Sequence, residues 1–348
     1  MRHRTDESGL AVVLQDLYRR VWGPIETALP DDTQTAIISP DASLNFVSFA
    51  TLLTPGDEFL AQKHSLRYVT SGRDLLTKPE RAPGSEMVVF ASPDYSDSRT
   101  GTAPTSGLYL APLTNFASNA AALEARAKRW NWPVSVFLGA NATETQLRPV
   151  RSPHILHLAT HGFLLPETIR GVSRFSFLGL ITDSTGASGR VLLRNPMQRS
   201  GVALAGAQVT LNAWQRGEIP PTGNDGILTA EEVSGLKLRG TWLVVLAACD
   251  TGIGELRFGE GVMGLRRGFV QAGAQNLLMT LWPVFDISSG EFMLDFYTAV
   301  QKTGNAPDAL ASVQRDWLVR LREKHGLSAA VVLGGPFILS SQGQFQEL

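Results

Sequence analysis

The chain has 348 residues, of which 43% are hydrophobic and 18% are charged, and its formal net charge is −1. This composition is typical of a compact protein with ample apolar residues for a core, and the balanced charge gives no electrostatic reason to expect binding to nucleic acid or to an anionic membrane. The single cysteine excludes an intrachain disulfide framework and fits a reducing compartment.

The N-terminal segment carries no recognisable targeting signal. Its basic start is interrupted by Asp6 and Glu7, and the apolar run "LAVVL" that follows is too short for the core of a signal peptide. No apolar run elsewhere approaches the roughly 20 residues needed to span a bilayer. We therefore expect a cytoplasmic protein without a membrane-spanning segment.

Short apolar runs alternate with helical patterns along most of the chain. Several runs are apolar at consecutive positions, which is typical of strands that are covered on both faces of a parallel sheet. The predicted strands span residues 35–39, 87–91, 134–139, 154–160, 242–248, 276–282 and 330–339, and the predicted helices span 115–130, 260–273, 288–304 and 305–326. This alternation predicts an α/β fold with a mostly parallel sheet flanked by helices.

Three polar stretches interrupt this pattern. Residues 92–107 are predicted to link a smaller N-terminal part, about residues 1–115, to a larger part, about residues 116–348. Residues 164–176 and 212–226 are predicted to be loops, the second because it contains paired prolines and three glycines.

Two of the predicted strands end in reactive side chains. "HILHLATHG" brings His161 and Gly162 to the end of one strand, and "TWLVVLAACDTGIG" brings the lone thiol of Cys249 to the end of another. Reactive groups gather beyond the carboxyl ends of parallel strands, so both side chains emerge at one edge if the two strands are neighbours. An imidazole that takes the thiol proton, or lowers the thiol pKa, prepares the sulfur to attack a carbonyl. Backbone amides after the strand ends can stabilise the resulting oxyanion, and glycine lets the main chain approach a substrate.

Other interpretations of these residues lead to different kinds of protein. A lone cysteine on an apolar strand is often an inert core residue, and a histidine at a strand end has the same structural alternative. A metal site at His154, His157 and His161 is not expected, because His154 points away from the other two and no second cysteine or acidic run completes the site. A nucleotide-binding loop is not expected either, since Arg257 stands where the glycine pattern from Gly252 requires glycine. We therefore predict no metal and no cofactor.

Longer segments around these residues resemble the CHAT domain, a caspase- and separase-like module of clan CD cysteine peptidases. The resemblance rests on "HLATHG" (157–162), "LVVLAACDTGIGE" (243–255) and "GEGVMGLRRGFVQAGAQNLLMTLWPVFD" (259–286), with further similar segments over about residues 10–340. It implies a caspase-like sheet, a smaller non-catalytic (pseudo-protease) subdomain at residues 1–115 and a catalytic subdomain at residues 116–348.

The resemblance also implies roles for individual residues. Cys249 would be the nucleophile, His161 the base or ion-pair partner, and the amides of Gly162 and Cys249 the oxyanion hole. In separases the acidic residue of the "LWxVxD" segment lies in the S1 pocket and pairs with a basic P1 side chain, which implies that Asp286 is the S1 residue here. Asp286 is also suited to cap the helix predicted from residue 288, and Phe285 stands where a second acidic residue is frequent.

We therefore expect a cytoplasmic cysteine endopeptidase that cleaves a protein or peptide after a basic residue and is activated by a partner or an upstream sensor. Family members often follow tetratricopeptide repeats, which are not visible in this sequence, so a regulatory protein or a repeat-containing partner is expected, and the chain is either a solitary CHAT protein or part of a longer one. Two alternatives stay open: a catalytically silent caspase-like scaffold that binds a partner protein, and a thiol acyltransferase or hydrolase that does not act on peptides.

Overall fold

The structure is a computed structural model that describes residues 2–78, 84–96, 109–164, 168–170, 190–192, 195–215, 224–247, 249–250, 258–284 and 286–343. The chain divides into two compact units. The terminal unit comprises Met1–Pro79 and Leu278–Leu348, and the central unit comprises Glu80–Leu277. The sequence predicted a boundary near residue 115 between a non-catalytic part and a catalytic part. Because that boundary is defined by function, it stays a prediction.

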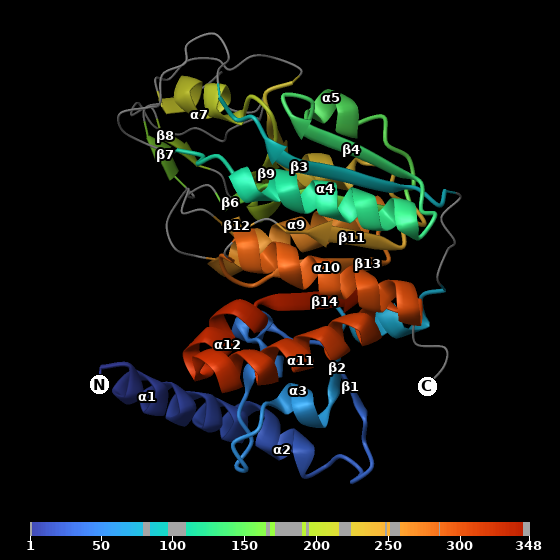
Figure 1. The fold of residues 1–348 in the computed structure, drawn as a ribbon. Coiled ribbons are helices and arrows are strands. Elements are labelled where there is room, and N and C mark those ends of the chain that lie inside the picture. The colour runs from blue at the N-terminus through green and yellow to red at the C-terminus, as the bar shows by residue number, and fades with distance from the viewer. Residues whose placement is uncertain are drawn as a thin grey trace. The chain divides into compact units, whose positions relative to one another are not determined.

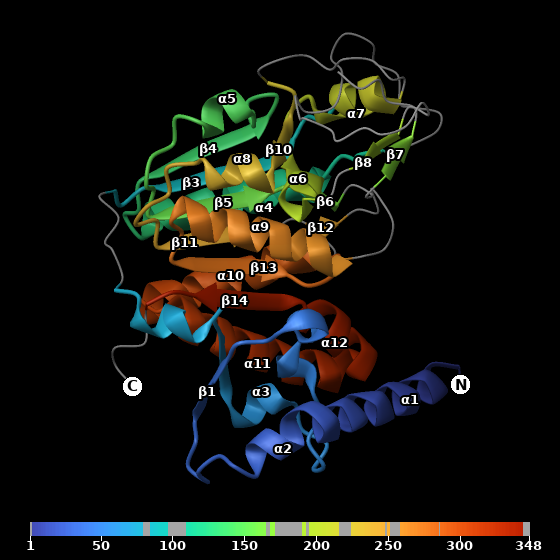
Figure 2. The same cartoon turned by 180° about the vertical axis from the view of Figure 1, so that it is seen from behind.

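The central unit contains four strands of the mostly parallel sheet, in the order β4-β3-β5-β11. Neighbouring strands are parallel, and nearly every residue of β3, β5 and β11 is buried. Helix α4 covers one face of these strands, and helices α8 and α9 cover the other (Figures 1 and 2). These elements are β3 (Met87–Pro93), β4 (Val134–Gly139), β5 (Ile155–Ala159), β11 (Leu243–Leu246), α4 (Thr114–Arg129), α8 (Ala230–Ser234) and α9 (Phe258–Ala272). Cover on both faces explains the unbroken apolar runs that predicted the strands.

A second sheet in the central unit has the strand order β10-β9-β6-β12. Its strands are β6 (His161–Leu164), β9 (Ser200–Ala203), β10 (Ile227–Thr229) and β12 (Cys249–Asp250). Strand β6 continues the chain from β5 after a bend at Thr160, and β12 follows β11 along the chain. The prediction that His161 and Cys249 stand at the ends of the main-sheet strands is therefore wrong in detail, because each residue begins a strand of the second sheet. An apolar run shows which residues are buried but not where the chain passes from one sheet to another.

The other described elements of the central unit are short, except for helix α7. They are the antiparallel pair β7 (Thr168–Arg170) and β8 (Arg190–Leu192), and the helices α5 (Glu144–Leu147), α6 (Pro196–Arg199) and α7 (Ala207–Gln215). Strand β7 lies within the predicted loop at 164–176, and α7 enters the predicted loop at 212–226. The rest of these two loops, apart from residues 164 and 224–226, lies outside the described residues, as does most of the predicted linker at 92–107.

The terminal unit contains strands in the order β1-β2-β14-β13, where only the last three residues of β13, from Leu278, belong to this unit. Helix α11 packs on β2 and β14, and the ring of Phe292 in α10 stacks on Phe337 of β14 with centroids 3.7 Å apart. The strands are β1 (Thr35–Ile38), β2 (Ser65–Tyr68), β13 (Asn276–Thr280) and β14 (Phe337–Ser341), and the helices are α1 (Arg2–Leu17), the π-helix η1 (Tyr18–Trp22), α2 (Gly23–Glu26), α3 (Leu60–Lys63), α10 (Asp286–Thr303), α11 (Ala306–His325) and α12 (Leu327–Gly334), with short 3-10 turns at Ala42–Phe46, Phe49–Thr51 and Gly72–Leu76. Helix α11 begins as predicted, since the Asn305 side chain accepts a hydrogen bond from the amide of Asp308 at 3.1 Å.

The strand predicted at residues 330–339 is wrong in its first half. Residues up to Gly334 belong to helix α12, and the strand begins only at Phe337. A short, wholly apolar run fits a buried helix as well as a buried strand, and Gly335 and Pro336 mark the change between them. Among the described residues, no helix combines the length and the apolar composition needed to cross a bilayer.

Candidate active site

The strands that precede His161 and Cys249 are direct neighbours in the sheet. Strand β11 pairs in parallel with β5, from Leu243 opposite Ile155 to Leu246 opposite Leu158. Three residues further along each chain, β12 pairs in parallel with β6, and Cys249 lies opposite His161. Since paired strands lie about 4.8 Å apart, the backbone places the two residues side by side. The expectation required the two preceding strands to be parallel neighbours, and β5 and β11 are; where the two side chains emerge stays a prediction.

The imidazole of His161 is buried and held by a main-chain carbonyl. His161 is 2% exposed, and its Nε2 lies 2.7 Å from the carbonyl oxygen of Ala111. A carbonyl only accepts hydrogen bonds, so the proton of the neutral ring belongs on Nε2 and Nδ1 keeps a free lone pair. An imidazole in this tautomer can take a proton through Nδ1.

Tyr95 supports the same imidazole from one side. Its ring stacks on His161 with centroids 5.1 Å apart, and its hydroxyl oxygen accepts the His161 amide hydrogen bond at 3.2 Å. The Tyr95 hydroxyl lies 2.9 Å from Oγ1 of Thr160, whose own hydroxyl donates to the carbonyl of Ala203. Tyr95 is therefore the donor to Thr160. Burial raises the pKa of Tyr95, which keeps the hydroxyl neutral and able to donate.

The pKa of His161 is lowered from its ordinary value near 6.5. Burial is the main cause because it disfavours the charged ring, and the hydrogen bond to Ala111 opposes it in part. The imidazole is therefore neutral at neutral pH, which is the state that can accept a proton from a thiol.

The orienting contacts of His161 were not predicted from the sequence. One is the main-chain carbonyl of Ala111; every residue type has such a carbonyl, so the sequence does not indicate it. The other, Tyr95, lies in a polar stretch where nothing distinguishes it from a surface residue. Pro112 is the only sequence signal near Ala111, since a proline restricts the residue before it to extended conformations.

Comparison with known protein families gives a match over most of the chain. The family model of the CHAT domain matches residues 12–329. The chain belongs to the CHAT domain family. Among solved structures, the chain is similar to the Arg-specific cysteine proteinase gingipain R (RgpB), with a TM-score of 0.48 and 7% identity over 97% of this chain and 68% of that one. No curated protein sequence matches the chain.

Two residues that the CHAT resemblance assigns, Asp286 and Cys249, are described without their side chains. Asp286 is the first residue of α10 in the terminal unit, so the helix begins two residues earlier than predicted. Gly162 pairs with Val202 of β9 and with Asp250 of β12. The S1 role of Asp286 and the oxyanion-hole role of the Gly162 and Cys249 amides stay predictions.

The other two histidines of "HILHLATHG" are separate from this site. His154 stacks on Trp242 with centroids 5.0 Å apart, and burial lowers its pKa. His157 lies within β5, where burial lowers its pKa to about 4. Within the described ranges of the CHAT chain, no three His, Cys, Asp or Glu side chains are grouped as metal ligands would be.

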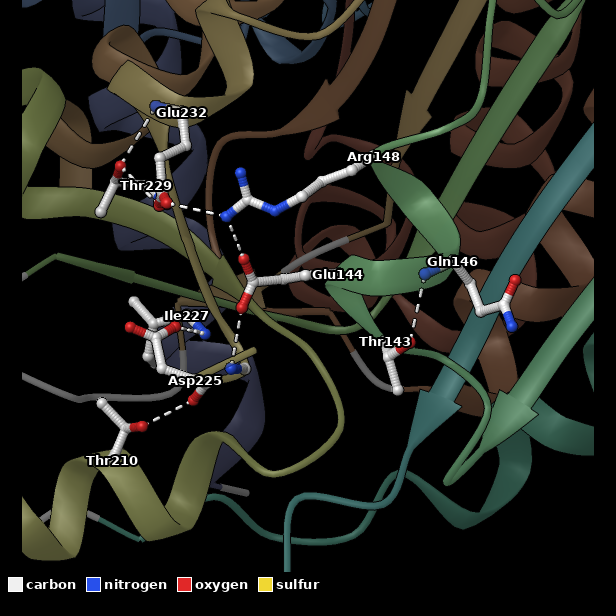
Figure 3. Close-up of polar contacts among 10 residues, drawn as sticks. Thr143, Glu144, Gln146, Arg148, Thr210, Asp225, Ile227, Thr229 and Glu232 are labelled. Carbon is white, nitrogen blue, oxygen red and sulfur yellow. Dashed lines mark hydrogen bonds and ion pairs between the residues drawn. The ribbon is translucent and has the colours of Figure 1, made fainter. Parts of the chain in front are cut away.

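A pair of carboxyl groups, the buried Glu144 and the half-buried Asp225, forms a second polar centre that sequence patterns did not indicate. Glu144 is 1% exposed, and its carboxylate accepts hydrogen bonds from Arg148 at 2.6 Å and from the Gly226 amide at 2.9 Å (Figure 3). Arg148 also donates to Glu232 at 3.1 Å. Burial, and after it the charge of Asp225, raises the pKa of Glu144 to about 7, and burial also raises the pKa of Asp225. Glu144 joins α5 to the segment before β10, and the ion pair between Arg148 and Glu232 joins it to α8.

Proposed function

We propose that this CHAT domain chain is a cysteine endopeptidase that works with Cys249 as nucleophile and His161 as base. The observation that carries the proposal is the parallel register of β12 and β6, which sets Cys249 opposite His161. Membership of a caspase-like cysteine protease family supports the same reaction class. The neutral, buried imidazole adds a base in the protonation state that the reaction needs.

The reaction follows from the hydrogen bonds of His161. Nε2 donates to Ala111, so Nδ1 is the atom that takes the thiol proton while Sγ of Cys249 attacks the scissile carbonyl. The protonated imidazole then gives this proton to the leaving amine, and an acyl-enzyme remains. Water, deprotonated by the same Nδ1, attacks the thioester and releases the acid and the thiol. The Ala111 carbonyl favours the imidazolium in each half-reaction because it accepts a hydrogen bond from the charged ring.

The tetrahedral intermediates need donors for the oxyanion. The amides of Gly162 and Cys249 are the proposed donors, since backbone N–H groups cost no rearrangement when the charge develops. Burial of the surrounding residues strengthens such interactions because water is excluded.

The proposed specificity is for a basic P1 residue. Asp286, in the "LWPVFD" segment, is the proposed partner of an arginine or lysine side chain, because a carboxylate discriminates strongly in favour of a cation. Activation by a partner protein or an upstream sensor is proposed as well, since a protease that is always active would damage the cell that makes it.

Cleavage of a peptide library in which only the P1 residue varies tests the proposal. Cleavage after Arg and Lys, lost in both Cys249→Ala and His161→Ala, is the expected result. If Asp286→Asn lowers kcat/KM for Arg peptides but not for peptides with a neutral P1 residue, the S1 assignment holds. A protein that cleaves no peptide, and whose partner binding survives Cys249→Ala, would be a scaffold. Reaction with small acyl donors without peptide cleavage would indicate a transferase or hydrolase.

A further inference from the structure

Two segments of the central unit contact the imidazole of His161. Tyr95, which follows β3, stacks on the ring, and Ala111, which precedes α4, accepts the hydrogen bond from Nε2. The position of the ring therefore depends on how these two segments are held relative to each other. Neither segment is part of a strand or helix at these residues, so no backbone ladder fixes them.

Gln208, in the first turn of α7, makes a hydrogen bond to each of the two segments. Its main-chain amide donates to the carbonyl of Tyr95 at 3.0 Å. Its side-chain Oε1 accepts from the amide of Leu110 at 2.9 Å, and its Nε2 donates to Oδ1 of Asn212 at 2.9 Å. Gln208 is 5% exposed and Leu110 is 2% exposed. Buried hydrogen bonds of this kind hold geometry firmly, because breaking one leaves a buried polar group without a partner.

We propose that Gln208 is a positioning residue for His161, acting through the Leu110–Ala111 segment. This inference rests on the proposed function, in which His161 is the base of the dyad. Pro112 already limits Ala111 to extended conformations, so the direction of the Ala111 carbonyl depends on where its segment is anchored. Gln208 anchors the segment one residue before Ala111, and Ser92 anchors it afterwards by donating to the Leu113 carbonyl at 2.7 Å.

Substitution of Gln208 can test this arrangement, whereas no substitution removes the main-chain carbonyl of Ala111. Gln208→Met keeps the length of the side chain and removes the acceptor. Gln208→Asn keeps the amide but is one methylene too short to reach Leu110. Gln208→Glu keeps the acceptor for Leu110, and the Asn212 amide can turn to donate to it. Thr210→Val is the matched control, because Thr210 lies on the same helix and its hydroxyl donates to the Asp225 carbonyl at 2.6 Å, away from Tyr95 and Leu110.

The experiment measures alkylation of the full chain by iodoacetamide over a range of pH. Cys249 is the only cysteine, so the rate reports on this thiol alone. In the wild-type chain the rate at pH 6 to 7 should exceed that of His161→Ala, because the imidazole takes the thiol proton. Gln208→Met and Gln208→Asn should lower this His161-dependent rate about tenfold, since small displacements of a catalytic group are costly. Gln208→Glu and Thr210→Val should keep most of it.

A second readout is the ¹⁵N spectrum of His161, assigned by comparison with His161→Ala. The wild-type chain should show the neutral ring with its proton on Nε2, and Gln208→Met should show a mixture of both tautomers. If Gln208→Met alkylates like the wild-type chain and keeps the tautomer while His161→Ala is slow, the positioning role is refuted and the dyad stands. If His161→Ala alkylates as fast as the wild-type chain, the dyad fails, and the tautomer alone then decides the role of Gln208.

Discussion

The buried carboxyl of Glu144 should make the free energy of unfolding of this chain fall as the pH rises from about 4.5 to about 7. This carboxyl is buried, and the nearby Asp225 makes a second negative charge unfavourable, so its pKa rises from about 4.5 to about 7. An unfolded chain loses this proton near pH 4.5, whereas the folded chain keeps it until about pH 7. Between these values the folded state binds more protons, so the free energy of unfolding falls as pH rises. A pKa difference of this size corresponds to about 3 kcal/mol.

Glu144→Gln removes the titrating group and keeps an oxygen that can accept the Gly226 amide. Urea denaturation of both proteins from pH 4.5 to pH 8 should show that the wild-type chain loses up to about 3 kcal/mol of stability relative to the variant. Thr143→Ala is the control. It removes the cap of α5, in which Thr143 Oγ1 accepts from the Gln146 amide at 3.2 Å, and should cost about 1 kcal/mol at every pH (Figure 3). If the wild-type and Glu144→Gln curves stay parallel, the reasoning about the carboxyl pair is refuted.

Three further predictions concern the dyad and the second sheet. Because burial lowers the pKa of His161 and the reaction needs the neutral ring, kcat/KM should rise with pH through a midpoint below 6.5; a midpoint above 6.5 would contradict this. Tyr95→Phe keeps the stacked ring but leaves the buried His161 amide unpaired, so the free energy of unfolding should fall by about 1–3 kcal/mol. Its kcat should also fall at temperatures well below Tm, where the variant is still folded; unchanged kinetics would exclude a supporting role. Gly201→Ala places a Cβ 2.5 Å from a carbonyl of β10 and should destabilise by about 1–3 kcal/mol, whereas Gly72→Ala, with no atom within 4 Å, should be nearly neutral by thermal unfolding.

The sequence was most informative where one physical pattern dominates. Strand β11 and the helices α4, α9 and α11 lie within two residues of their predicted limits, because unbroken apolar runs and capping residues mark buried strands and helix ends. Residue type alone also drew attention to His161 and Cys249. Their adjacency depended on β5 and β11 being neighbours, which periodicity cannot show because it carries no information on strand order.

What the sequence could not supply was the surroundings of the imidazole. The orienting groups are a carbonyl at Ala111, a tyrosine in a polar stretch, and a glutamine, Gln208, nearly fifty residues beyond the histidine. Each acts through a long-range contact that leaves no local pattern. The Glu144–Asp225 pair was missed for the same reason, since the two carboxyls meet only in the folded chain.

The central claim is that Cys249 and His161 act together as a peptidase dyad. The most direct test is mass spectrometry of the intact chain after exposure to a peptidyl acyloxymethyl ketone with arginine at P1, followed by mapping of the modified residue. We expect a single covalent adduct on Cys249 that forms much more slowly in His161→Ala. Equal labelling of the wild-type chain and His161→Ala, or no adduct on Cys249, would contradict it.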